Sequence, residues 1–246
     1  RGRGEQSSDD AIATITLDSP ANRNALSKQL VTELIDALHA TAQSAAKVVV
    51  IASSQRVFCS GADLSEAAEG GMAQGAAALV EIQRLILAHP LPIVVRLDGP
   101  VRAGGLGIVA AADLVIAHEA TTFAFTEVRL ALAPSVISLT VLPRLNNRAA
   151  YDTFLTGRTF SAEEAAQMGL ITRATDDVAE GLQRLRQFLA AQVVFLDHLI
   201  EADAPQARGN RRAPCRYCSG STFSPRAARS PEYPRSASFA RTTRSG

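Results

Sequence analysis

The sequence predicts an α/β domain in which buried strands alternate with amphipathic helices. Residues 48–52 form a continuous apolar run without the polar alternation of a half-exposed strand, and residues 93–97 form a second run that is apolar except at Arg96. Such runs are typical of strands in a parallel sheet that is covered on both faces. Apolar residues at helical spacing separate the two runs, so we expect helices packed on a parallel sheet.

Local signals mark the individual elements. Residues 12–17 predict a strand, which ends at the turn signal Asp18-Ser19-Pro20-Ala21-Asn22. A helix is expected over 26–38, with Ser27 as its N-cap. The next elements, in chain order, are the strand at 48–52, a loop at 53–63, a helix with Leu79, Ile82 and Ile86 on one face that Pro90 and Pro92 end, the strand at 93–97, a glycine-rich turn at 99–107 and a strand at 114–118.

Two helices are expected in the second half. Ser161 and Glu164 have the spacing of a capping box, in which each side chain bonds the backbone amide of the other residue. Gly169 suits the position after this helix, where φ is positive. Residues 178–196 predict a further amphipathic helix.

Charge and composition divide the chain. Residues 206–246 carry nine Arg, no Lys and one acid, so this segment has a charge of +8 and the remainder has −7. The basic balance therefore does not indicate a nucleic-acid surface on the folded part. Because 206–246 contains no Leu, Ile, Val or Met, we predict that it is disordered. The expected organisation is a flexible leader at 1–10, a core at 11–192, a possible helix remnant at 193–205 and this tail.

Composition also excludes some classes of protein. The most apolar window, 103–117, is too short to cross a bilayer and contains Asp113, so we expect no membrane span. Three Cys, of which Cys59 lies far from the other two, cannot build a disulfide framework. With no apolar leader at the start of the sequence, this predicts a cytoplasmic protein.

Two short loops offer backbone amides at the ends of buried strands. In Phe58-Cys59-Ser60-Gly61-Ala62-Asp63-Leu64, Gly61 permits a tight turn and the Ala62 amide lies near a helix N-terminus. Ala103-Gly104-Gly105-Leu106-Gly107 opens an apolar run. Two converging amides form an oxyanion hole, which stabilises an enolate or a tetrahedral oxyanion. Glycine turns of purely structural purpose have the same spacing, so spacing alone leaves both interpretations open.

Several motifs in register carry a family resemblance. They are Ile15-Thr16-Leu17-Asp18-Ser19-Pro20 with Asn24-Ala25-Leu26, the 58–64 loop, Gly104-Gly105 with Ala112-Asp113, residues 123–134, and residues 157–165 with Gly169-Leu170-Ile171. Over 11 to about 192 the sequence resembles the crotonase superfamily of enoyl-CoA hydratases and isomerases. The resemblance implies an α/β spiral of ββα units, a homotrimer or dimer of trimers, and a C-terminal helical part. The chain does not resemble that part from Val193 onward, so we expect it to be truncated or aberrant.

The resemblance also implies roles for single residues. The backbone amides of Ala62 and Gly104 hold the thioester oxygen of an acyl-CoA. Coenzyme A belongs to the substrate, so we expect no separate cofactor and no metal. Cys59 is expected to be a packed thiol rather than a nucleophile. The residues expected to bind the coenzyme A part are Asn22, Arg23, Cys59, Gly61, Ala62, Asp63 and Leu64.

The expected acid and base depart from the hydratases of that superfamily. Those enzymes place one Glu three residues after the oxyanion-hole glycine and another twenty residues further on, where this sequence has Gly107 and Glu127. Glu127 has apolar neighbours, and desolvation there raises a carboxyl pKa towards the range of a general base. A single Glu suits a proton transfer from C2 to C4 of a 3-enoyl thioester, although hydration through one Glu stays open. We predict an enoyl-CoA hydratase/isomerase that acts on unsaturated acyl-CoA in fatty-acid or related acyl-CoA metabolism.

The same features allow other interpretations. Glu127 is alternatively an exposed residue after a strand. Gly107 and the unusual tail fit a non-catalytic acyl-CoA-binding or scaffold protein. The run from Gly105 to Ala110 matches G-x-G-x-x-A, the fingerprint of nicotinamide-dinucleotide-binding domains. The pair Cys215 and Cys218 has C-x-x-C spacing, but one such pair is not a zinc signature.

Overall fold

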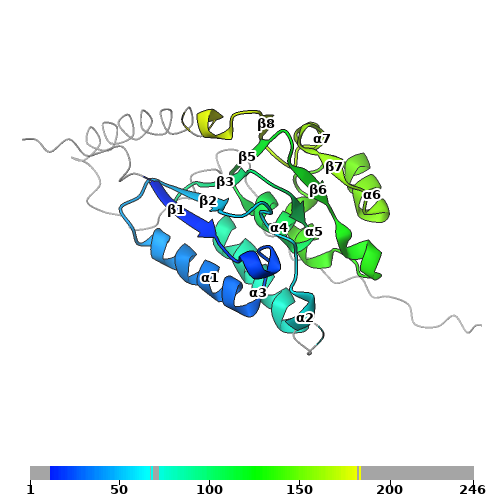
Figure 1. Cartoon of the computed structure of the whole chain (residues 1–246), viewed down its shortest axis with the longest axis horizontal. Helices are drawn as coiled ribbons and strands as arrows, with labels where there is room; N and C mark the ends of the chain where they lie inside the picture. The colour runs from blue at the N-terminus through cyan, green and yellow to red at the C-terminus, as the bar shows by residue number, and fades with distance from the viewer. Residues whose placement is uncertain (1–11, 67, 69–71, 182, 184–246) are drawn as a thin grey trace, which may run out of the picture. The chain divides into compact units, whose positions relative to one another are not determined.

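A five-stranded parallel sheet forms the centre of the protein in a computed structural model (Figure 1). The structure describes residues 12–66, 68, 72–181 and 183. The strand order is β1-β2-β3-β5-β8, and each neighbouring pair is parallel. These strands are β1 (Ile12–Leu17), β2 (Val48–Ser53), β3 (Ile93–Leu97), β5 (Leu114–His118) and β8 (Arg173–Thr175).

A second, three-stranded sheet lies after β3 in the chain. It consists of β4 (Val101–Arg102), β6 (Thr122–Ala124) and β7 (Phe160–Ser161). The β4–β6 pair is parallel and the β6–β7 pair is antiparallel. The α-helices are α1 (Lys28–Ala42), α2 (Leu64–Glu66), α3 (Met72–Leu87), α4 (Gly104–Ala111), α5 (Ser135–Val141), α6 (Asn147–Thr156) and α7 (Ala162–Gln167), and two 3-10 helices are η2 (Pro20–Asn22) and η4 (Thr126–Leu130).

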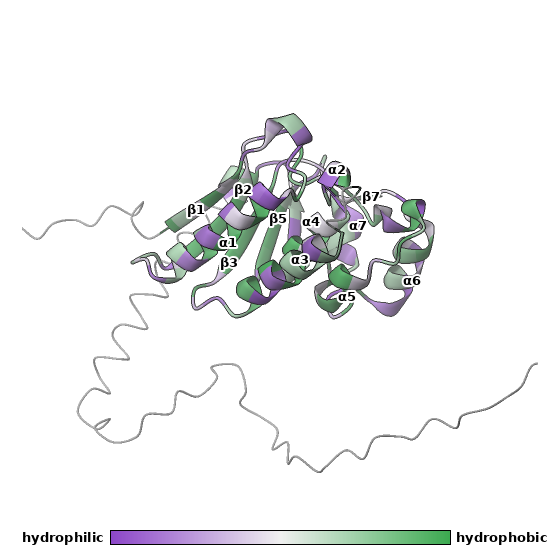
Figure 2. Cartoon of the chain, turned by 90° about the horizontal axis from the view of Figure 1, so that it is seen from below, coloured by the Kyte–Doolittle hydropathy of each residue, from purple (hydrophilic) through white to green (hydrophobic). Residues whose placement is uncertain are grey.

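The core lies between the large sheet and its helices. The middle strands are buried along almost their whole length, and α1 and α3 each turn an apolar face inwards. Figure 1 shows α1 and α3 side by side along one side of the sheet, and these helices contact each other. In Figure 2 the strands are largely green, whereas α1 carries purple segments, as expected for a helix with one face in solvent.

Most elements with strong local signals are confirmed. The strands expected at 12–17, 93–97 and 114–118 have these bounds in the structure. The Leu30 amide donates to Ser27 Oγ at 3.3 Å, which is the predicted N-cap. The capping box is also present, because the Ser161 amide donates to Glu164 Oε2 and the Glu164 amide donates to Ser161 Oγ. Gly169 follows α7 with a φ of +89°.

The expectation of a glycine-rich turn over 99–107 is wrong. Val101 and Arg102 pair with β6, and a helix, α4, begins at Gly104. All eight residues of α4 are buried, so it has no polar face from which a helical period could be read. Glycine is also a poor helix former, and tertiary packing overrides that propensity here. A Cβ at Gly105 would lie 2.7 Å from Cys59 Cβ, so only glycine lets α4 approach the 58–64 loop.

Several predictions concern residues that the structure does not describe. These are the leader at 1–10, the helix remnant at 193–205, the tail at 206–246 and the Cys215–Cys218 pair. The helix expected at 178–196 begins at Val178, and most of its length lies outside the described residues. No helix in the described ranges is long and apolar enough to cross a membrane.

Candidate active site

Both predicted oxyanion-hole residues and Glu127 line one cavity of about 360 Å³. Its wall combines the 58–64 loop, the first half of α3, the start of α4, η4 and the segment from Leu130 to Ile137. These segments are far apart in the sequence, so the cavity exists only in the folded chain. Most of the lining side chains are apolar, and those of Asp63, Glu66 and Glu127 are acidic.

The 58–64 loop is held on both sides by backbone hydrogen bonds. The Arg102 amide donates to the Cys59 carbonyl at 2.9 Å, and the Leu26 amide donates to the Gly61 carbonyl at 2.8 Å. Gly61 has a φ of +100°, and a Cβ there would lie 2.9 Å from Ala103 Cβ. This position therefore requires glycine on both conformational and steric grounds. The turn presents the next amide, that of Ala62, on the wall of the cavity.

The second amide lies at the N-terminus of α4. Ala103 precedes the helix with φ +44° and ψ −121°, a strained conformation for alanine, and its amide donates to the Ala124 carbonyl at 3.1 Å. A Cβ at Gly104 would lie 2.9 Å from Leu26 Cδ1. The start of a helix carries a partial positive charge, which favours an anion at this place.

Neither amide has a partner within the described part of the chain. The Ala62 and Gly104 N–H groups donate no backbone hydrogen bond there. The loops that carry them touch, because an ideal Cβ at Gly61 would lie 3.8 Å from the Gly104 nitrogen. Two backbone amides without a hydrogen-bond partner in the described part of the chain therefore belong to adjacent segments of one cavity wall.

Glu127 lies on η4 and is half-buried, so the alternative of an exposed Glu is wrong. Its Oε2 atom is buried and has no hydrogen-bond partner in the structure. Burial raises the pKa of the Glu127 carboxyl above its usual range, as the apolar neighbours in the sequence predict. A carboxylate that is desolvated but unpaired is a stronger base than one in water.

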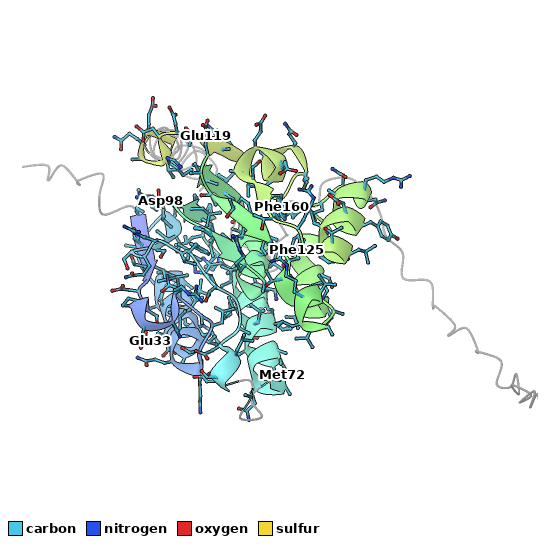
Figure 3. The ribbon with its side chains drawn as sticks, turned by 45° about the vertical axis from the view of Figure 1, so that its right-hand side comes forward. Glu33, Met72, Asp98, Glu119, Phe125 and Phe160 are labelled. Atoms are coloured by element: carbon cyan, nitrogen blue, oxygen red, sulfur yellow. The ribbon has the colours of Figure 1, made fainter. Side chains whose placement is uncertain are left out.

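Contacts with α6 and with the residue that follows it hold η4 in place. Phe125, just before η4, packs edge-on against Phe154 with ring centroids 4.5 Å apart, and Figure 3 shows it beside Phe160. Arg129 Nη2 donates to the Gly157 carbonyl at 2.6 Å. The backbone that carries Glu127 is thereby joined to the end of α6.

Gly107, where the resemblance places the first Glu of the hydratases, is closely packed. An ideal Cβ at Gly107 would lie 3.0 Å from Ile137 Cγ2 and 3.1 Å from Gln83 Oε1. Gln83 is only 2% exposed, and the Thr140 hydroxyl donates to its Oε1 at 2.7 Å. Gln83 Nε2 donates to the Leu79 carbonyl at 3.1 Å. The sequence did not reveal the contact between Gln83 and Thr140. The available signal was a polar residue, Gln83, on the otherwise apolar buried face of α3.

Only some of the residues expected to bind coenzyme A line the cavity. Ala62, Asp63 and Leu64 line the cavity, whereas Asn22, Arg23, Cys59 and Gly61 do not. Hydrogen bonds from Ser65 and from Asn22 hold the pKa of the Asp63 carboxyl below its usual range.

Three of the residues outside the lining have distinct surroundings. Asn22 Nδ2 donates to Asp63 Oδ2 at 3.1 Å and so joins η2 to the loop. Arg23 is exposed. Cys59 is fully buried, and burial raises the pKa of its thiol to about 12, so the expected packed thiol is confirmed.

Asn24 organises the base of the site and was not recognised as more than part of a motif. It is completely buried, and its Nδ2 donates to Ser53 Oγ at 2.8 Å and to the Val57 and Phe58 carbonyls. The Ser19 amide donates to Asn24 Oδ1 at 2.6 Å. A single side chain therefore ties the end of β1 to the start of the 58–64 loop.

The dinucleotide fingerprint is not formed as a binding turn. Gly105 and Gly107 lie inside α4 rather than between a strand and a helix, and both are buried. Within the described ranges, no three His, Cys, Asp or Glu residues lie close enough to hold a metal ion.

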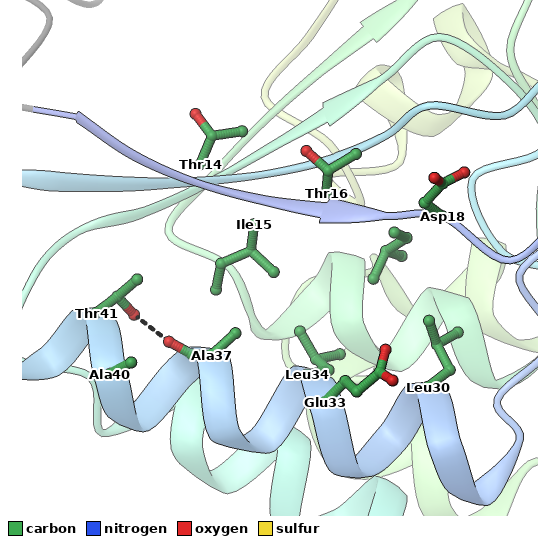
Figure 4. Close-up of a pocket in the computed structure, with 11 residues that line it drawn as sticks. Thr14, Ile15, Thr16, Asp18, Leu30, Glu33, Leu34, Ala37, Ala40 and Thr41 are labelled. Carbon is green, nitrogen blue, oxygen red and sulfur yellow. Dashed lines mark hydrogen bonds between the residues drawn. The ribbon is translucent and has the colours of Figure 1, made fainter.

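A second cavity, of about 350 Å³, lies between β1 and α1 (Figure 4). Figure 4 shows Ile15 directed towards α1, with Thr14 and Thr16 on the other side of the strand. The Thr41 hydroxyl donates to the Ala37 carbonyl at 2.9 Å. None of the predicted site residues lines this cavity.

The amino-acid sequence matches one protein family and several proteins of known name. The family described as Enoyl-CoA hydratase/isomerase matches residues 7–208, which extends beyond the expected core at both ends. A Rhodobacter capsulatus protein named "Probable enoyl-CoA hydratase" is 36% identical over 173 residues, 69% of this chain and 67% of the relative. The rat "Enoyl-CoA hydratase domain-containing protein 3, mitochondrial" is 31% identical over 78% of this chain and 65% of its own length. The chain thus spans about two thirds of the length of these relatives.

Solved structures agree with the sequence matches. The crystal structure of an enoyl-CoA hydratase from Mycobacterium avium superposes with a TM-score of 0.69 at 36% identity, over 79% of this chain and 82% of that one. A family match over residues 7–208 and a shared fold at 36% sequence identity both indicate common descent. The chain belongs to the enoyl-CoA hydratase/isomerase family, within the crotonase superfamily.

Proposed function

We propose that the protein is an acyl-CoA enzyme of the hydratase/isomerase type, with Glu127 as its single acid and base. The main support comes from three groups on residues of one cavity wall. The Ala62 and Gly104 N–H groups have no hydrogen-bond acceptor in the described part of the chain, and the buried Oε2 atom of Glu127 has no hydrogen-bond donor. The thioester oxygen of the substrate accepts hydrogen bonds from the Ala62 and Gly104 amides. This arrangement stabilises an enolate more than the neutral thioester, and that difference is what lowers a barrier.

The proposed reaction is a proton transfer along a 3-enoyl thioester. The Glu127 carboxylate removes a proton from C2, and the electron pair moves towards the thioester oxygen to form a dienolate. The protonated Glu127 then returns a proton at C4, which leaves the double bond between C2 and C3. The raised pKa of Glu127 favours this role, because it brings the carboxyl closer to the acidity of the thioester α-proton.

Isomerisation is favoured over hydration by the packing at Gly107. Two carboxylates that share a water molecule need a side chain at that position, and even a Cβ there would lie 3.0 Å from Ile137 Cγ2 and 3.1 Å from Gln83 Oε1, so these neighbours would have to shift. Hydration would have to proceed through Glu127 alone. We therefore propose isomerase activity, with hydration of 2-enoyl-CoA as the comparison reaction.

We also propose that the chain assembles as a homotrimer or a dimer of trimers. Large apolar residues on α6 and beside it on α5 support this, since Leu139, Tyr151 and Leu155 are 62%, 70% and 71% exposed. Exposed apolar groups of this size are typical of protein interfaces. Light scattering on the purified chain would give the mass of the assembly, and a monomer at all concentrations would contradict the proposal. The cytoplasmic location remains a prediction from cysteine usage.

The test is mass spectrometry of the products formed from 3-enoyl-CoA and 2-enoyl-CoA in separate reactions. We expect conversion of the 3-enoyl substrate without a change in mass. Glu127→Gln should lower its turnover by about 100-fold or more, and Glu119→Gln is the matched control because that Glu is exposed. Equal turnover in the Glu127 variant would exclude it as the base. Acyl-CoA binding without any reaction would favour a binding or scaffold protein.

A further inference from the structure

Ala103 has a backbone conformation that glycine adopts more readily than alanine. Its φ of +44° and ψ of −121° lie outside the regions that L-residues ordinarily occupy. By contrast, Arg23 and Ala131 also have a positive φ, but their ψ values of 45° and 30° are those of the ordinary left-handed region. Strained residues of the first kind persist only where the surrounding structure holds them, and they cluster at functional sites. The conformation of Ala103 therefore indicates a role.

Backbone hydrogen bonds hold Ala103 in this conformation. Its amide donates to the Ala124 carbonyl of β6 at 3.1 Å, and its carbonyl accepts from the Leu106 amide of α4 at 2.9 Å. The preceding residue, Arg102, donates its amide to the Cys59 carbonyl at 2.9 Å. A glycine at position 103 could make the same two bonds without strain. These bonds explain the conformation, but they do not explain the methyl group.

The methyl group of Ala103 lies where the two amide-bearing segments of the cavity wall meet. An ideal Cβ at Gly61 would lie 2.9 Å from Ala103 Cβ, which is the nearest atom to it, and 3.8 Å from the Gly104 nitrogen. Gly61 precedes Ala62, and Ala103 precedes Gly104. The side chain of Ala103 thus packs against one segment, while its backbone leads directly into the other.

We propose that Ala103 is a positioning residue whose methyl group acts as a spacer between the Ala62 and Gly104 amides. The proposal rests on the proposed function in one respect, namely that these two amides bind the thioester oxygen. Glycine at position 103 would relieve the backbone strain and remove the spacer. The two donors would then be less well preorganised, and the charged oxygen of an enolate would lose more than the neutral thioester oxygen.

The experiment compares Ala103→Gly with Ala120→Gly. Ala120 is exposed in the turn after β5 and does not line the cavity, so the control makes the same substitution away from the site. The probe is acetoacetyl-CoA, a 3-oxoacyl thioester that loses its C2 proton to form a stable enolate with its own ultraviolet absorbance. We would measure the fraction of bound probe in the enolate form at a fixed pH, the affinity for butyryl-CoA by isothermal titration, and the melting temperature.

Ala103→Gly should change stability and enolate binding in opposite directions. It should melt at a higher temperature than wild type because the strain is gone, whereas Ala120→Gly should melt slightly lower because glycine raises the entropy of the unfolded chain. The ratio of bound enolate to bound neutral probe should fall by about tenfold, which is less than the loss of a whole donor. Affinity for butyryl-CoA, which stays neutral, should change by no more than about threefold. A residue of purely structural purpose would not lower the enolate ratio while raising the melting temperature.

The enolate measurement needs no turnover, so it separates this proposal from the proposed reaction. Should no enoyl-CoA react while wild type binds the enolate and Ala103→Gly loses it selectively, the reaction would be wrong and the role of Ala103 would stand. An unchanged enolate ratio in Ala103→Gly, an equal fall in Ala120→Gly, or a lower melting temperature of Ala103→Gly would each overturn the role of Ala103 and leave the proposed reaction intact. A wild-type chain that does not increase the enolate fraction of the probe would overturn both.

Discussion

The side chain of Gln83 packs closely against Gly107. An ideal Cβ at Gly107 would lie 3.1 Å from both Cδ and Oε1 of Gln83. Thr140 holds the same amide through its hydroxyl, which also lies 3.1 Å from the Gly107 carbonyl oxygen. The packing between α3, α4 and α5 therefore leaves little room for a residue larger than glycine at position 107.

Replacing Gly107 by Glu should destabilise the protein without creating a second catalytic carboxylate. The added side chain meets Gln83 and Ile137 in a packed interior, and overpacking of this kind costs about 1–3 kcal/mol, with a further penalty for burying a carboxylate. Thermal unfolding and the 2-enoyl-CoA hydration assay are the measurements. The double variant Gly107→Glu, Gln83→Ala is the control, since it makes room and should recover part of the lost stability. A fully stable single variant with new hydratase activity would contradict this account.

Turnover should follow the ionisation of Glu127. Its folded-state pKa lies above the ordinary value of 4.5, and the carboxylate is the form that we propose as the base, so kcat/KM for 3-enoyl-CoA should rise as the pH increases through the raised pKa and then level off. A pH profile of the isomerase assay gives this midpoint. An inflection below the ordinary value of a Glu carboxyl would show that a different group is being titrated.

The same group should also change the pH dependence of stability. Because the folded-state pKa is raised, the stabilisation from protonating Glu127 is complete below the unfolded pKa and is lost as the pH rises through the folded pKa. At pH 7 the wild-type protein therefore carries a desolvated charge that Glu127→Gln lacks. The variant should melt at a higher temperature than wild type at pH 7, and the difference should shrink on acidification. Calorimetry at several pH values, with Glu119→Gln as control, tests this sign.

Cys59 should resist alkylation in the native protein. Its thiol is fully buried, and with a pKa of about 12 it holds almost no reactive thiolate near neutral pH. Peptide mapping after treatment with iodoacetamide should show Cys59 unlabelled in the native protein and labelled in denaturant. Rapid native labelling at this peptide would mean that the 58–64 loop opens or that the thiol is ionised.

Removing the Asn24 side chain should weaken both the fold and the site. Asn24→Ala leaves the buried Phe58 carbonyl without this donor and the half-buried Val57 carbonyl with only Ser53 Oγ, and an unsatisfied buried group costs about 1–3 kcal/mol. Chemical denaturation should show a loss in that range, accompanied by lower turnover because the 58–64 loop is less firmly held. Asn22→Ala, which removes one half-buried bond to Asp63, is the comparison and should lose less stability. Equal losses in both variants would argue against the central position of Asn24.

The sequence by itself determined the elements whose signals are local. The strand at 12–17, the Ser27 cap and the Ser161–Glu164 capping box each depend on residues within a few positions of one another, and the structure confirms them. The family could also be recognised, because its motifs keep their order and spacing along the chain. These features do not require knowledge of which segments meet in space.

Only the tertiary structure decided what depends on distant contacts. It made a helix of glycines 104, 105 and 107 because their small size allows α4 to pack against Cys59, Leu26 and Gln83. It also brought the Leu130–Ile137 segment and the first half of α3 to one cavity, and it packed Gln83 against Gly107. The physical reason is that close packing depends on the volume and shape of residues that are remote in sequence, and no local period encodes that information.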